Sequence, residues 1–264
     1  ASSYINTQPV GEVLERTPLL SLRDIRAGYD QVPFLDSISL DVYPGDFIAV
    51  MGDNGSGKST LLQTIANLVQ PLAGHVWLAG EDTHPRPVSE LARSIGYVFQ
   101  NPAHQLFANR VREEALFAPS NFGILDDEMT DHARQLLQKA GLLEREKDHP
   151  FLLSYGQMRR LNLISVLVYK PVLFLLDELL IGQDVENGIF LLEWLQVMRQ
   201  SGAAVVMVNH NPDAVYAFAS RILFMQSGKI LFDLPVRTGF EKLEEMGRFA
   251  YLPAAWSRAE VRVA

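Results

Sequence analysis

The sequence has no cysteine, no excess of positive charge and no long apolar run, and each absence excludes a class of protein. Without cysteine there is no disulfide, no thiolate nucleophile and no cysteine-ligated zinc, and the composition fits a reducing compartment. The 23 Lys and Arg residues against 31 Asp and Glu residues give a net charge of −8, so no broad basic surface for nucleic acid is expected. The longest apolar stretches, 161–169 and 172–176, are separated by Lys170 and Pro171, and neither approaches the ~18 residues that a membrane-spanning helix needs.

What remains is the composition of a globular protein. The chain has 264 residues, of which 48% are hydrophobic, and this is enough to bury a core. Residues 1–18 are polar and contain Pro and Gly, which predicts a linker or flexible arm. This start has no initiator Met and none of the features of a signal peptide, as expected either for a trimmed chain or for a piece cut from a longer polypeptide.

From residue 19 onward, the hydrophobic pattern first predicts an antiparallel sheet and then a parallel one. Short β-like runs at 19–25, 37–43 and 75–80 predict an antiparallel sheet with one solvated face. Nearly unbroken apolar runs follow, typical of parallel strands covered on both faces, at 46–51, 94–99, 172–177 and 204–209. Between about 103 and 160 the pattern is helical, with Asp126 or Asp127 as a cap and Gly141 as a stop, which predicts an inserted helical lobe.

The segment GDNGSGKST fits the phosphate-loop pattern G-x-x-x-x-G-K-[ST] and follows the apolar run 46–51. Its glycines allow backbone N–H groups to surround phosphate oxygens, Lys58 is placed to reach the β- and γ-phosphates of a nucleotide, and Ser59 can ligate Mg²⁺. A glycine-rich turn with a solvated lysine would match by chance in roughly one chain in a hundred of this length. The residues expected to bind nucleotide here are Gly52, Asn54, Gly55, Ser56, Gly57, Lys58, Ser59 and Thr60.

Two acids follow the apolar run 172–177. Asp177 ends the run and is placed to hold the Mg²⁺ shell, and Glu178 is able to take a proton from the attacking water. On its own, such a pair would be interpreted as a solvated strand end. Together with the phosphate loop it predicts a phosphoryl-transfer site.

Six elements in order resemble the nucleotide-binding domain of ABC transporters over about residues 19–233. They are Tyr29, the phosphate loop, FQNP with Gln100, LSYGQ at 153–157, LLDE at 175–178 and VNH with His210. The resemblance implies an α/β protein with the P-loop NTPase fold of ABC ATPases: a RecA-like parallel sheet core, an N-terminal antiparallel β subdomain and the α-helical lobe. It places the ATPase domain at 19–234 and a short C-terminal extension at 235–264.

The resemblance also implies roles for single residues. In this family two domains stack head to tail, so the signature residues Ser154, Gly156 and Gln157 would contact the ATP of a second ATPase domain. Asp184 would lie in the loop that communicates across this dimer.

The other implied roles concern the chain's own nucleotide. Tyr29 would stack on adenine, Gln100 would contact Mg²⁺ and the attacking water, and His210 would contact the γ-phosphate and orient Glu178. Without the resemblance, these would be a core tyrosine, a turn glutamine and a strand-end histidine.

Finer features resemble the ATPases of energy-coupling factor (ECF) importers. The segments YVFQNPAHQLF and LSYGQMRR and the tail EKLEEMGRFAYLPAAW carry this likeness. It implies a peripheral subunit at the cytoplasmic face of the cell membrane. There a transmembrane scaffold carries a membrane subunit that binds a vitamin or a metal ion such as cobalt or nickel. The stretch 103–125 would form the scaffold's docking groove, the other interpretation being an ordinary exposed helical surface.

The sequence departs from the family pattern at three points. Tyr155 replaces the first signature glycine, Leu179 and Leu180 replace Pro-Thr, and Gly182-Gln183-Asp184 stands for Ala/Gly-Leu-Asp. These changes fit an asymmetric heterodimer or two ATPase halves of one polypeptide.

Three hypotheses follow for the function. The chain is the ATP-hydrolysing engine of an importer, a nucleotide-binding regulatory half, or an ABC ATPase acting on DNA or the ribosome. The last would carry long insertions, coiled-coil heptads or a basic surface, and the sequence shows none of these.

Overall fold

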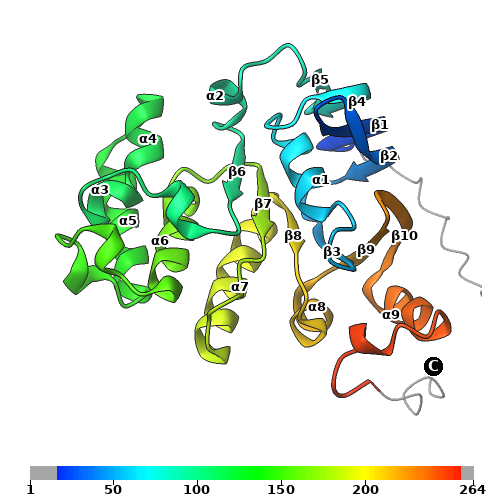
Figure 1. Ribbon diagram of the computed structural model, residues 1–264. Coiled ribbons are helices and arrows are strands. Elements are labelled where there is room, and N and C mark those ends of the chain that lie inside the picture. Colours follow the sequence, from blue (N-terminus) through cyan, green and yellow to red (C-terminus); the bar gives the residue numbers. More distant parts are fainter. Residues whose placement is uncertain (1–16, 257–264) are drawn as a thin grey trace, which may run out of the picture.

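Figure 1 shows the computed structural model of the chain, which describes residues 17–256. The predicted linker at 1–18 lies almost entirely outside these residues. The strands are β1 (Leu20–Tyr29), β2 (Val32–Val42), β3 (Phe47–Gly52), β4 (Pro71–Leu78), β5 (Glu81–Asp82), β6 (Ile95–Val98), β7 (Leu173–Asp177), β8 (Ala204–Val208), β9 (Arg221–Gln226) and β10 (Lys229–Pro235). The α-helices are α1 (Lys58–Ile65), α2 (Val88–Leu91), α3 (Val111–Ala115), α4 (Phe117–Phe122), α5 (Asp127–Lys139), α6 (Tyr155–Leu167), α7 (Val185–Gln200), α8 (Pro212–Phe218) and α9 (Val236–Glu245). Short 3-10 helices lie at Pro102–Gln105, Leu143–Arg145, Pro150–Leu152 and Phe249–Tyr251.

Two sheets carry the fold, as the sequence pattern predicts. The first is antiparallel, with strand order β2-β1-β4-β5. The second has the order β10-β9-β3-β8-β7-β6, in which β6, β7, β8, β3 and β9 run parallel and β10 is an antiparallel edge strand. The four predicted parallel strands are β3, β6, β7 and β8, and β3, β7 and β8 are buried along their whole length. The predicted fold class is confirmed.

Helix α1 packs between the two sheets (Figure 1). Its Leu61 and Ile65 are fully buried in one hydrophobic cluster that includes Leu22 of β1 and Val50 of β3. Because apolar surface from both sheets converges on α1, the start of this helix is held in a fixed place. That start is the phosphate loop.

The helices α3, α4 and α5 form a lobe beside the six-stranded sheet (Figure 1, green). Helix α5 begins as predicted, because the Asp126 side chain accepts a hydrogen bond from the Met129 backbone N–H at 2.7 Å. Just past its end, Gly141 has φ of +67°, which suits a glycine stop. Helix α6 continues past residue 160 to Leu167 and packs against both the lobe and β6.

The described residues after β10, 236–256, fold back onto the second sheet. Phe240 and Leu243 of α9 are fully buried against Met51 of β3 and Phe224 of β9. The hydrophobic contact makes this tail part of the core of the domain. No helix within residues 17–256 is both long enough and apolar enough to cross a membrane.

Candidate functional site

The phosphate loop connects β3 to α1 and depends on glycine at both ends. Gly52 has φ of +142°, and a Cβ there would lie 2.1 Å from the Met225 carbonyl oxygen. Gly57 caps α1 with φ of +104°, and a Cβ there would lie 2.7 Å from Leu35 Cδ2. A side chain at either position would clash and would strain the backbone. The motif glycines are therefore required by the shape of the loop.

Lys58 closes the loop on itself. Its Nζ donates to the Gly52 carbonyl at 2.9 Å and to the Asp53 carbonyl at 2.8 Å. The side chain is buried, and burial lowers the pKa of the ammonium, while the nearby carboxylates of Glu178, Asp177 and Asp53 oppose this shift. A cation held at the start of a helix, among backbone N–H groups, suits an anionic ligand.

A cleft of about 600 Å³ opens over the loop. This volume lies within the range of small-molecule and cofactor sites. Its polar lining comes from the loop and from the ends of β6, β7 and β8. The lining residues are Phe34, Asn54, Gly55, Ser56, Gly57, Lys58, Ser59, Thr60, Gln100, Glu178, Ile181 and His210.

Three predicted catalytic side chains meet in this cleft. The Gln100 Nε2 donates to Glu178 Oε2 at 2.7 Å, and His210 Nε2 lies 3.2 Å from Glu178 Oε1. They follow β6, β7 and β8, whose carboxyl ends meet at one edge of the parallel sheet. The geometry places a carboxylate between an amide and an imidazole, an arrangement suited to proton abstraction.

Glu178 itself adopts an unusual backbone conformation. Its φ is +54°, in the left-handed region. Such a conformation costs a non-glycine residue about 1–3 kcal/mol, and residues of this kind gather at functional sites. The turn directs the Glu178 carboxylate into the cleft, whereas the preceding Asp177 stays 3% exposed.

Asp177 offers a site for a metal ion. Burial raises the pKa of its carboxyl, while the Ser59 hydroxyl hydrogen bond and the Lys58 charge lower it. Its Oδ1 has no hydrogen-bond partner among the described residues. A carboxylate with a free oxygen, a serine hydroxyl and the amide oxygen of Gln100 are hard oxygen ligands, and this donor set fits Mg²⁺.

The structure does not bring Tyr29 to the cleft. This side chain is 54% exposed, lines a separate recess with Leu68 and donates its hydroxyl to Gln63 Oε1 at 2.6 Å. Phe34 lines the cleft instead and is 45% exposed. Phe34 was not among the predicted site residues, although an aromatic ring on the solvated face of β2, shortly before the phosphate loop, is a usable signal.

The signature residues lie apart from the cleft. Ser154 caps α6, accepting from the Gln157 N–H at 3.3 Å, and Gln157 Oε1 accepts from the Ser154 N–H at 2.9 Å. At Gly156 a Cβ would lie 2.9 Å from the Gly182 carbonyl oxygen. Asp184 caps α7 through the Asn187 N–H at 2.8 Å. Among the described residues that line the cleft, none comes from these two helix starts.

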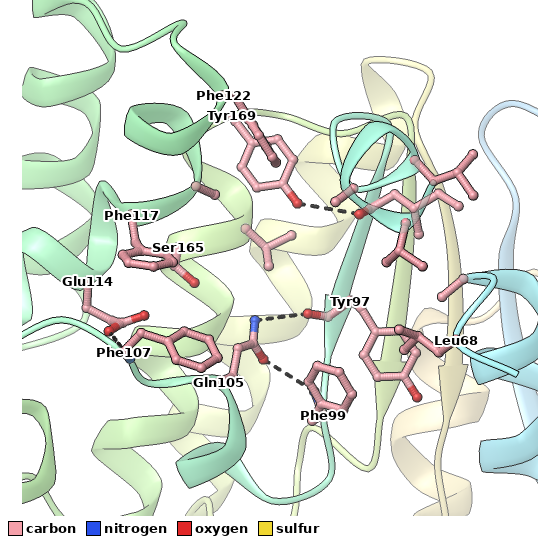
Figure 2. A pocket seen from close by; sticks show the side chains of 17 residues that line it. Leu68, Tyr97, Phe99, Gln105, Phe107, Glu114, Phe117, Phe122, Ser165 and Tyr169 are labelled. Atoms are coloured by element: carbon pink, nitrogen blue, oxygen red, sulfur yellow. Dashed lines mark hydrogen bonds between the residues drawn. The ribbon is translucent and has the colours of Figure 1, made fainter. Parts of the chain in front are cut away.

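A second cavity, of about 220 Å³, lies between β6, α2, α4 and α6 (Figure 2). Its lining is mainly apolar and aromatic, and Phe107 and Phe117 stack with ring centroids 5.5 Å apart. The Glu114 carboxylate accepts from the backbone N–H groups of Phe107 and Ala108, both at 2.7 Å. Burial raises the pKa of Glu114 against the effect of these two bonds. The buried carboxylate thereby fixes the loop that presents Phe107, which is 67% exposed.

Comparison with known sequences gives a consistent result. The family described as ABC transporter matches residues 35–180. A putative ABC transporter ATP-binding protein of Methanosarcina acetivorans is 34% identical over 225 residues, which are 85% of this chain and 42% of the relative. The energy-coupling factor transporter ATP-binding protein EcfA of Methanothermobacter thermautotrophicus is 33% identical over 81% of this chain and 70% of that protein. The chain thus spans about two fifths of the first of these relatives and 70% of the second.

Solved structures share the fold. The cbiO1 protein of Clostridium perfringens, described as part of the ABC transporter complex cbiONQ, has a TM-score of 0.73 at 24% identity, covering 89% of this chain and 98% of that one. A dimeric ATP-binding cassette in a post-hydrolysis state with ADP and Pi has a TM-score of 0.74 at 25% identity, covering 83% of this chain and 99% of that one.

Proposed function

The chain belongs to the family of ABC transporter ATP-binding proteins, and from that premise we propose that it is the ATP-hydrolysing subunit of an ECF-type importer. The observation that carries this is the meeting of Gln100, Glu178 and His210 over the phosphate loop. The EcfA relative supports the ECF branch, and the cbiO1 structure adds a likeness of fold. The cargo we propose is a vitamin or a transition-metal ion.

In this proposal the loop amides and Lys58 bind the phosphates, and Phe34 offers an aromatic surface beside them. The Glu178 carboxylate takes the proton of the attacking water, while His210 and Gln100 orient that carboxylate. Ser59, Asp177 and Gln100 would hold Mg²⁺, which neutralises charge on the phosphates when bound. The contacts of Gln100 and His210 with Glu178, beside the carboxyl ends of β6, β7 and β8, support these roles.

The signature residues would serve a second ATPase domain. Ser154 is exposed at the start of α6, where the helix dipole and free N–H groups favour an anion. Because Ser154 lies outside its own cleft, this surface suits the nucleotide of a partner stacked head to tail. We propose a homodimer, a heterodimer or two fused halves, held at the membrane by a transmembrane scaffold.

The cavity of Figure 2 is the proposed docking groove for that scaffold. It lies between the lobe and the six-stranded sheet, and its rim carries the exposed side chains of Phe107, Phe117, Val88 and Leu68. An apolar groove with an exposed aromatic rim suits an amphipathic helix of the membrane subunit. This helix of the membrane subunit would move together with the helical lobe when the ATPase dimer closes.

The first experiment tests nucleotide-driven closure. Glu178→Gln should bind ATP and form a stable dimer with ATP and Mg²⁺, whereas Lys58→Ala should stay monomeric, as followed by sedimentation velocity. Glu193→Gln, at an exposed position of α7, is the matched control and should behave as the parent does. A Glu178→Gln protein that forms no dimer with saturating ATP, either alone or mixed with its partner ATPase domain, would contradict closure by this site.

The second experiment tests the groove. Phe107→Glu should release the chain from its detergent-extracted membrane complex, because a charge cannot be buried against an apolar helix without cost. Phe249→Glu is the control, since Phe249 is 65% exposed and lies in the C-terminal segment. Equal retention of the two variants in the complex would remove the groove from the proposal.

A further inference from the structure

Arg159 of α6 is the bulkiest fully buried side chain among the described residues. A buried guanidinium is costly unless its N–H groups find acceptors. The Nη1 atom donates to the Glu178 carbonyl at 2.6 Å, and Nη2 donates to the Gln100 carbonyl and to the Tyr155 hydroxyl, the latter at 3.0 Å. These acceptors are two backbone carbonyls and one hydroxyl. The Arg159 Nε has no hydrogen-bond partner among the described residues, so the guanidinium is held through its two Nη groups by the loops of the cleft and by Tyr155.

The two carbonyls belong to the residues whose side chains meet over the phosphate loop. The planar fork of an arginine fixes the separation of acceptors that it bridges. The backbone of Glu178 is in the left-handed region, and the hydrogen bond from the buried Arg159 to the Glu178 carbonyl stabilises this conformation. On the cleft side, Gln100 Nε2 and Glu178 Oε2 are 2.7 Å apart. Arg159 thus ties the backbones of the same two residues.

Tyr155 completes the arrangement. Its hydroxyl donates to the Gln100 carbonyl at 3.1 Å, and the Arg159 guanidinium carbon lies 5.1 Å from the centre of its ring. The ring remains 43% exposed at the start of α6. A glycine at position 155 would make neither contact. Tyr155 therefore connects the exposed start of α6 to the loop of Gln100 directly and to that of Glu178 through Arg159, one helical turn along α6.

We propose that Tyr155 and Arg159 are positioning residues that keep Gln100 and Glu178 in the relative positions that hydrolysis needs. They also make the geometry of the chain's own cleft depend on what binds at the start of α6. This rests on the proposed ATPase function. A nucleotide that a partner presents to Ser154 would then act on Glu178 through the Tyr155 hydroxyl and the Arg159 guanidinium, without a direct contact to either loop.

Tyr155→Phe and Arg159→Lys test the proposal. Tyr155→Phe deletes only a hydroxyl from a partly exposed ring, and Arg159→Lys keeps the charge but cannot bridge both carbonyls. We expect kcat for ATP to fall about 3–10-fold in the first and about 10–100-fold in the second, since misplaced catalytic groups cost up to about 100-fold. The KM for ATP should stay unchanged, because the phosphate loop is untouched. Tyr216→Phe, at an exposed tyrosine of α8, is the control.

Hydrogen exchange in the nucleotide-free protein gives a second readout. Amides of 99–101 and 177–180 should exchange faster in Tyr155→Phe than in the parent, with the rest of the chain unchanged. In a Glu178→Gln background, Arg159→Lys should cause no further fall in kcat, because it acts through Glu178. Unchanged kcat in Tyr155→Phe, or a fall that adds fully to that of Glu178→Gln, would overturn the proposal. A Glu178→Gln protein with full turnover would instead refute the proposed function itself.

Discussion

Replacing Lys58 with Met separates the two tasks of this lysine. In the nucleotide-free protein the change leaves the Gly52 and Asp53 carbonyl oxygens without their donor. An unsatisfied buried acceptor costs about 1–3 kcal/mol, and removal of a buried cation offsets part of this loss. We therefore expect Lys58→Met to fold, with a free energy of unfolding lowered by about 1–3 kcal/mol.

The larger effect should be on nucleotide binding. Loss of one charged hydrogen bond to phosphate is worth about 1.5–3 kcal/mol, or roughly 10–150-fold in Kd. At ATP equal to about 100 times the parent Kd, ligand binding stabilises the parent by about 2.7 kcal/mol. If Kd rises about 100-fold, the same ATP stabilises the variant by only about 0.4 kcal/mol.

Urea unfolding with and without a non-hydrolysable ATP analogue and Mg²⁺ measures this difference directly. Lys139→Met, at an exposed position near the end of α5, controls for loss of a lysine elsewhere. Its stabilisation by the analogue should match that of the parent. If Lys58→Met is also stabilised as much as the parent, then Lys58 does not contact the nucleotide and the reasoning from the phosphate loop is refuted.

Two further changes probe the C-terminal segment, both by urea unfolding. Phe240→Ala should lower the free energy of unfolding by about 3–5 kcal/mol, because the ring is fully buried against the second sheet. A loss under about 1 kcal/mol would show that the core does not depend on α9. Tyr251→Phe tests pH dependence: burial, and the hydrogen bond to Asp53 at 2.7 Å, raise the pKa of Tyr251 to about 12. Because the unfolded tyrosine has a pKa of about 10, the stability from this phenol is present below pH ~10 and lost as pH rises toward ~12. The stability gap between the parent and Tyr251→Phe should shrink over that range, and a constant gap would contradict the assignment.

Much of the site could be predicted from the sequence because short stretches of neighbouring residues determine it. The phosphate loop needs glycines at fixed spacing, so GDNGSGKST identifies it without knowledge of the rest of the fold. The buried strands are continuous apolar runs, and their carboxyl ends place Gln100, Glu178 and His210 at one edge. The Asp126 cap of α5 follows from the same kind of local signal.

Features that depend on distant contacts could not be predicted in this way. The local pattern LSYGQMRR gives no sign of burial, yet Arg159 is fully buried because the carbonyls of Gln100 and Glu178 accept its hydrogen bonds. Tyr155 replaces the first signature glycine, and nothing in the local sequence indicates that its hydroxyl donates to the Gln100 carbonyl. Tyr29 lies at the end of β1, where its hydroxyl contacts Gln63 of α1 and its side chain lines a recess separate from the cleft.

Hydrolysis by Glu178 is best measured as ATP turnover by the proposed membrane complex, with Glu178→Gln in this chain alone. We expect turnover to fall about 10²–10⁴-fold, because the proposed general base is lost while the phosphate loop still binds ATP. Uptake of cargo should fall with it, and Glu193→Gln should leave both rates unchanged. Turnover equal to that of the parent complex would contradict hydrolysis by Glu178 and leave this chain as a nucleotide-gated clamp beside a partner that performs the chemistry.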